Sequence, residues 1–128
     1  MERAIQIFIA LPGVILGLQA IGWILDPKGT AESLGMPLLD GIARSTQVGD
    51  MTAFFAGISA MILLGAFRRN PIWLASAAVL LAGAAIFRTL AWAVHGADFT
   101  PQFIVPEVVM SAILLFGITR FRVEASSH

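Results

Sequence analysis

Long apolar stretches alternate with short polar segments along the chain, and four of these stretches have the length of a membrane span. They cover approximately residues 5–25, 49–67, 72–95 and 103–119. A helix needs about 20 predominantly apolar residues to cross roughly 30 Å of hydrocarbon. The pattern therefore predicts an all-α fold, a bundle of four transmembrane helices that takes up the whole chain, residues 1–128, as a single domain.

Proline and glycine mark where the predicted helices end. Asp26-Pro27 ends the first, because proline disfavours helix at the preceding residue and cannot continue the hydrogen-bond ladder. Arg68–Pro71 forms a polar turn between the second and third helices, and Gly96 is a C-cap for the third. The only long connection, residues 28–48, is rich in leucine. We expect it to lie on the membrane surface or to cap the bundle.

Composition agrees with insertion into a membrane. Hydrophobic residues make up 58% of the chain and charged residues 12%, whereas a soluble domain carries about 25% charged residues. So little charge cannot cover a soluble surface. The eight basic and eight acidic side chains cancel, so no bulk positive field exists to attract nucleic acid. The absence of cysteine excludes disulfides, thiolate catalysis and cysteine-ligated metals.

The distribution of basic residues predicts the orientation. The first apolar stretch is too long for a signal peptide and no small-residue cleavage site follows it, so we expect it to be retained as a membrane helix. With four crossings, most basic residues near the helix ends fall on one side, and only Lys28 and Arg44 fall on the other. The larger group comprises Arg3, Arg68, Arg69, Arg120 and Arg122. The positive-inside rule then places both termini in the cytoplasm, and we expect a bacterial inner membrane.

Small residues in the first stretch predict close helix packing. Gly13 and Gly17 form a GxxxG pair, which lets two helix backbones approach each other in lipid. We expect the partner to be another helix of the same chain, and the alternative is that the pair also drives oligomerisation.

Polar side chains within the predicted spans gather at one level, in the outer leaflet. They are Gln19, Asp50, Arg88, His95 and Glu107. One interpretation is that each charged group only satisfies a helix terminus, where the helix dipole favours its sign. The other is a shared polar cluster, because charges inside spans are rare and usually pair. An arginine below the membrane boundary needs a carboxylate, so we predict that Arg88 pairs with Asp50, Glu107 or both.

A weak internal repeat extends this cluster. Gln19 and Trp23 are four residues apart, as are Arg88 and Trp92, which is consistent either with two similar helical hairpins or with chance, since tryptophan is common at membrane interfaces. The candidate ligand-binding residues are Gln19, Trp23, Trp92 and His95, and the candidate catalytic residues are Asp50, Arg88 and Glu107.

The segment Phe87–Trp92, the dipeptide His95-Gly96 and the opening Gly49-Asp50 resemble those of small bacterial four-helix membrane proteins of uncharacterised function. This resemblance implies the fold but no particular chemistry. The size is also similar to that of small multidrug resistance transporters. Those transporters rely on a glutamate in their first membrane helix, and the first helix predicted here has none.

Motifs of soluble enzymes are missing from the sequence. It has no G-x-S-x-G, phosphate loop or HExxH, and His95 together with His128 in the polar tail provides neither a zinc site nor a haem pair. We expect no metal and no cofactor. Three functions stay open: a binder of, or enzyme for, a membrane lipid or hydrophobic small molecule; a non-catalytic subunit of a homo-oligomer or larger membrane complex; and an oligomeric proton-coupled transporter. Catalysis, if any, would be proton transfer by a carboxylate.

Overall fold

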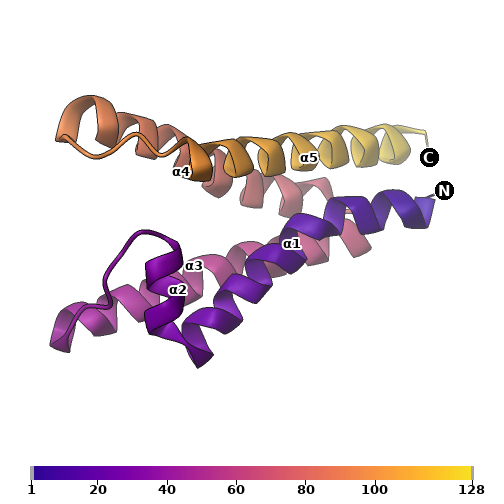
Figure 1. Ribbon diagram of the computed structural model, residues 1–128. Coiled ribbons are helices and arrows are strands. Elements are labelled where there is room, and N and C mark those ends of the chain that lie inside the picture. Colours follow the sequence, from indigo (N-terminus) through magenta and orange to yellow (C-terminus); the bar gives the residue numbers. More distant parts are fainter. Residues whose placement is uncertain (1, 128) are drawn as a thin grey trace.

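The computed structural model describes residues 2–127, so His128 lies outside the described residues. Within that range the chain forms five helices and no strand. They are α1 (Glu2–Leu25), α2 (Pro27–Ser33), α3 (Gly41–Phe67), α4 (Pro71–His95) and α5 (Pro101–Ser126) (Figure 1). Of these, α1, α3, α4 and α5 are long and apolar enough to cross a membrane. The predicted all-α fold with four membrane-spanning helices is confirmed.

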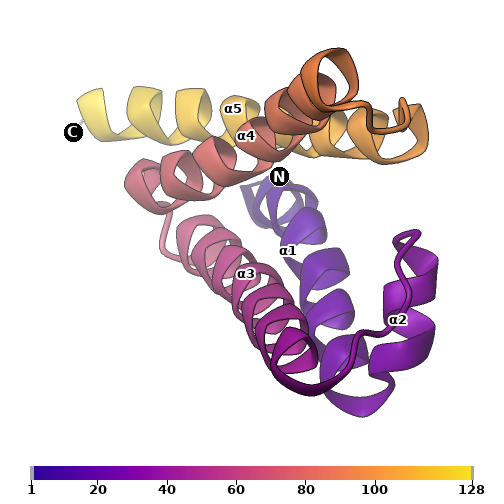
Figure 2. The ribbon, with the colours of Figure 1, turned by 90° about the vertical axis from the view of Figure 1, so that its left-hand side faces the viewer.

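The four long helices form two antiparallel pairs, α1 with α3 and α4 with α5. The pairs meet at the end where both chain termini lie and diverge toward the other end, which carries α2 and the α4–α5 loop (Figure 1). Seen from the side of that second end, the two pairs form separate layers (Figure 2). We call these ends the termini end and the loop end. The tight packing expected of a four-helix bundle is therefore restricted to the termini end.

Glycines bring α1 and α3 into close contact. A Cβ atom at Gly13 would lie 3.0 Å from Cγ2 of Ile62, and one at Gly17 would lie 2.8 Å from Oγ of Ser59. The Ser59 hydroxyl donates a hydrogen bond of 2.6 Å to the carbonyl of Gly13, which satisfies a buried hydroxyl across the interface. The predicted close packing of this GxxxG pair is confirmed, with a helix of the same chain as partner.

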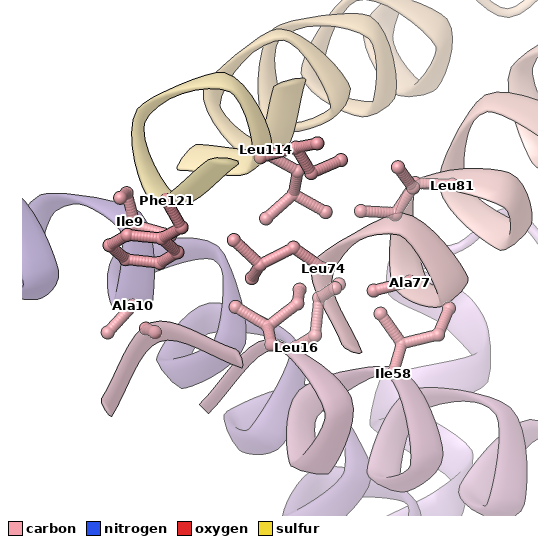
Figure 3. Close-up of a cluster of buried hydrophobic side chains, with 13 residues drawn as sticks. Ile9, Ala10, Leu16, Ile58, Leu74, Ala77, Leu81, Leu114 and Phe121 are labelled. Atoms are coloured by element: carbon pink, nitrogen blue, oxygen red, sulfur yellow. The ribbon is translucent and has the colours of Figure 1, made fainter. Parts of the chain in front are cut away.

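Leu74 of α4 joins the two pairs. Its side chain is fully buried and lies between Gly65 of α3 and Gly117 of α5, where added Cβ atoms would come within 2.6 Å and 2.9 Å of its methyl groups. Ile9 of α1 also contacts the position of Gly117. Figure 3 shows Leu74 at the centre of buried side chains from all four long helices. Glycine at both contact positions makes room for the leucine.

A polar network closes the termini end. Arg69, in the α3–α4 turn, has a left-handed backbone with φ of 51°. Its guanidinium lies 3.0 Å from the carboxylate of Glu2 and 3.7 Å from that of Glu124, and it donates to the side chain of Gln6 at 3.4 Å. Gln6 in turn donates to the carbonyl of Ala66, which the end of α3 leaves without a helical partner. The network connects α1, α5 and the α3–α4 turn.

Two predicted helix boundaries are wrong. α3 begins at Gly41 instead of near residue 49, because the side chain of Gln47 accepts from the Leu39 amide at 2.9 Å and donates to the Pro37 carbonyl at 3.0 Å. These contacts hold the preceding loop against a polar first segment of the helix.

The second wrong boundary lies at the C-terminal end. The residues after 120, predicted to be a polar tail, continue α5 to Ser126. Phe121 in this segment is buried in the core, and Glu124 contacts both Arg69 and Arg120. A hydrophobic anchor and two ion pairs thus extend the helix past its apolar stretch.

Replacing Gly13 and Gly17 together with leucine should destabilise the protein strongly. Each new side chain would push α1 away from α3, and overpacking a single site typically costs about 1–3 kcal/mol. Thermal unfolding in detergent measures the loss. The matched control is Gly83→Leu in α4, where an added Cβ meets nothing within 4 Å and stability should be nearly unchanged. A double variant as stable as this control would contradict the α1–α3 contact.

Candidate ligand-binding cleft

A cavity of about 740 Å³ lies between the two helix pairs. This volume is within the range of about 300–1,000 Å³ that is usual for small-molecule sites. All four long helices and the loop after α2 contribute to its lining. The apolar lining residues are Ile15, Leu16, Leu34, Met36, Met51, Phe54, Phe55, Leu81, Ala84, Phe87, Ala91, Phe103, Pro106 and Met110, and the polar ones are Gln19, Asp50, Arg88 and Glu107. The cavity is thus mainly apolar, with a few polar groups.

Arg88 of α4 and Glu107 of α5 form an ion pair in this cavity. Nε of Arg88 lies 3.1 Å from Oε1 of Glu107, and the side chains are 35% and 12% exposed. The guanidinium also lies 4.8 Å from the centre of the Phe103 ring, within the range of a cation–π contact. The predicted pairing of Arg88 is confirmed for Glu107.

This pair leaves hydrogen-bonding capacity unused on both sides. The Nε–H of Arg88 is not aligned for a hydrogen bond to Oε1 of Glu107. This oxygen is buried and has no hydrogen-bond donor among residues 2–127. The terminal nitrogens of Arg88 donate no hydrogen bond to any described residue. A guanidinium carries five N–H donors and binds carboxylates and phosphates in a bidentate manner. Arg88 can therefore hold an anionic group of a ligand while it contacts Glu107.

Asp50 faces the cavity from the opposite helix pair. It lies on α3, is exposed, and forms no ion pair with any residue between 2 and 127. Because α3 begins at Gly41, Asp50 lies about 14 Å along the helix instead of in its first turn. The interpretation of Asp50 as a satisfied helix terminus is thus wrong, since the dipole effect is confined to the first turn.

Only one of the four residues predicted to bind a ligand lines the cavity. Gln19 lines the cavity, but Trp23, Trp92 and His95 do not. Trp23 is fully buried, while Trp92 is 49% exposed with its ring 5.1 Å from that of Phe99. His95 is exposed in the last turn of α4, just before Gly96, whose φ of 71° confirms the predicted C-cap.

Sequence reasoning did not identify the aromatic side chains of the cavity. Phe54 follows Asp50 by four residues, and Phe103 precedes Glu107 by four, so each aromatic ring shares a helix face with an acid. That spacing was the available signal. The rings of Phe54 and Phe55 contact each other edge to face, 5.4 Å apart.

A second hollow of about 400 Å³ adjoins the cavity at the loop end. It shares Arg88 and Phe103 with the first, and its own polar lining comes from Asp98 and Thr100 in the α4–α5 loop and Gln102 in the first turn of α5. Arg88 therefore lies at the boundary between an apolar interior and a more polar mouth. This gradient suits a molecule with a tail and a head.

The chemistry available to the cleft is charge binding and proton transfer. Among residues 2–127 there is no group of three or more histidine, aspartate or glutamate side chains with metal-binding geometry. The carboxylate of Glu107 forms an ion pair with Arg88, whereas that of Asp50 forms no ion pair with any residue between 2 and 127. Asp50 is accordingly the carboxylate that can accept a proton or balance a positive charge.

Fold and cleft together define a four-helix membrane protein with an amphipathic cavity between two helix pairs. In comparisons with protein-family models, curated proteins and solved structures, no match to this chain was found. The function is therefore argued from the cavity itself.

Exchanging the charges of Arg88 and Glu107 tests their pairing. Either single reversal, Arg88→Glu or Glu107→Arg, should destabilise the protein by more than the double exchange, because each places two like charges next to each other. Unfolding in detergent measures the coupling energy between the two positions. We expect a value above the ~0.2–1 kcal/mol of exposed ion pairs and below the ~3–5 kcal/mol that breaking a buried pair costs. The control is the same exchange at the exposed pair Arg44–Asp40. Equal coupling at both pairs would mean that burial adds nothing.

Proposed function

We propose that this protein binds a lipid-like amphipathic molecule in the cleft between its helix pairs. The observation that carries the proposal is a mainly apolar cavity with an arginine at its polar mouth. The tail of the ligand would lie among the phenylalanine, methionine and leucine side chains. Its polar group would accept hydrogen bonds from the terminal nitrogens of Arg88.

Access from the lipid supports this choice of ligand. Ile15 of α1 and Phe87 of α4 both line the cavity, yet they are 54% and 66% exposed. Such exposure is expected of a cavity that opens sideways between the pairs, where a membrane would supply hydrophobic molecules directly. If the protein also acts on its ligand, Asp50 is the group available for proton transfer, since Glu107 is held by Arg88.

We also propose that the termini end faces the cytoplasm of a bacterial inner membrane. The basic residues at the termini end are Arg3 in the first turn of α1, Arg68 and Arg69 in the α3–α4 turn, and Arg120 and Arg122 in the last turns of α5. Toward the loop end the basic residues among those described are Lys28, Arg44 and Arg88, and Arg88 is paired inside the cavity. The excess of arginine favours the cytoplasmic side. The cleft would then open in the outer leaflet.

Reporter fusions test this orientation. A reporter that is active only in the periplasm should be inactive when inserted after Arg69 and active when inserted in the α4–α5 loop at Ala97. The same pair of insertions with a reporter that is active only in the cytoplasm should give the opposite result. Activity in the reverse pattern would place the cleft in the cytoplasmic leaflet.

Native mass spectrometry of the detergent-purified protein tests ligand binding. The wild type should carry a bound amphiphile, and Arg88→Gln should lose most of it. One hydrogen bond to a charged group is worth about 1.5–3 kcal/mol, which corresponds to roughly 10- to 150-fold in affinity. Arg122→Gln is the matched control, since Arg122 is exposed on α5, away from the cavity. Equal occupancy in the two variants would contradict binding at Arg88.

A second candidate function, a subunit of a larger membrane complex or homo-oligomer, is favoured by one feature of α3. Gly49, Ala53, Ala56 and Ala60 form an exposed stripe of small residues along the helix. Such stripes allow close contact between membrane helices. The same mass spectra report copy number, and a contact through this stripe predicts assemblies that Ala56→Leu reduces.

Proton-coupled transport has less support, because the core at the termini end is apolar.

A further inference from the structure

We infer that the ligand of the cleft is a zwitterionic amphiphile, with a positively charged group beside its anionic one. This inference rests on the proposed function and specifies the head group. It is based on the placement of the charges: Arg88 and Glu107 lie on the α4–α5 pair, and Asp50 lies on α3, across the cavity.

The charges that line the cavity do not balance. The cavity lining contains one cation, Arg88, and two carboxylates, of which only Glu107 has a partner. Among residues 2–127 no lysine and no second arginine lines the cavity, so the chain offers Asp50 no counter-charge there. A carboxylate in a mainly apolar, membrane-level cavity is unfavourable unless it is paired or hydrated. A positive group on the ligand would neutralise it.

Neither an anionic nor a cationic head group alone would satisfy both Arg88 and Asp50. A purely anionic head group would engage Arg88 but bring a further negative charge into a cavity that already has an excess of one. A purely cationic head group would pair with Asp50 but leave the terminal nitrogens of Arg88 without an acceptor. A zwitterion whose anionic group binds Arg88 and whose ammonium reaches Asp50 would satisfy both and would bridge the two helix pairs.

Aromatic side chains beside Asp50 suit the ammonium. Phe54 is one helical turn from Asp50 on the same face of α3, and both it and Phe55 line the cavity. An ammonium near the carboxylate would therefore also be within reach of aromatic faces, which attract cations. Phosphatidylethanolamine-type lipids and single-chain zwitterions share the required chemistry, an acidic phosphate or carboxylate close to an ammonium.

Three probes with the same dodecyl chain separate the contributions of the head group. They are dodecyl phosphate, dodecylphosphocholine and dodecyltrimethylammonium, titrated into the purified protein in maltoside micelles, with affinity measured by calorimetry. The wild type should bind the zwitterion most tightly, by up to about fivefold over dodecyl phosphate, as expected for one exposed ion pair. Asp50→Asn should remove this preference, whereas Asp50→Glu should retain it.

The matched control is Glu32→Gln, which removes a negative charge from exposed α2 outside the cavity and should leave the preference intact. If Asp50→Asn changes the affinities for dodecyl phosphate and dodecylphosphocholine equally, the inference is overturned while the proposed function stands. If Arg88→Gln binds dodecyl phosphate as tightly as the wild type, the proposed function itself fails.

Repeating the comparison with dilauroyl phosphatidylethanolamine and dilauroyl phosphatidic acid in nanodiscs identifies the source of the ligand. A larger gain in affinity for the two-chain zwitterion assigns the site to a membrane lipid, and a larger gain for dodecylphosphocholine assigns it to a single-chain molecule.

Discussion

The structure depends on how Leu74 packs between Gly65 and Gly117. In lipid, apolar side chains gain little from leaving their surroundings, so helices associate where close packing is possible. Leu74 of α4 contacts α3 in the other pair and α5 in its own pair, and glycine at both contact positions lets these backbones approach it. Because this contact lies near the termini end, the pairs are joined there and diverge elsewhere.

The cleft follows from that arrangement. Two helix pairs that touched along their whole length would fill the space between them with their own side chains. Here the Arg69 network reinforces the contact at the termini end, and at the loop end the connecting α2 packs beside α1. The charged residues near the loop end are therefore separated across a cavity, with Arg88 paired on its own side and Asp50 facing it from the other.

The sequence predicts the parts of this structure that are encoded locally. Hydropathy over about 20 residues identifies the four spans, and the spacing of Gly13 and Gly17 identifies a close helix contact. The pairing of Arg88 was predictable because an arginine at membrane depth needs a partner. The early start of α3 was not, since its polar first turns are stabilised by Gln47 through contacts with the preceding loop. Nor was the cleft, which depends on where two helix pairs touch.

The distance between the contact at Leu74 and the ion pair at Arg88 has a mechanical consequence. Fourteen residues of α4 separate them, which corresponds to a lever of about 21 Å. With a pivot at Leu74, a change of about 5° in the angle between the helix pairs shifts the mouth by roughly 2 Å, while the side chains at the pivot move by only a small fraction of that distance. A small change in the packing angle at Leu74 would therefore be amplified at the mouth of the cavity.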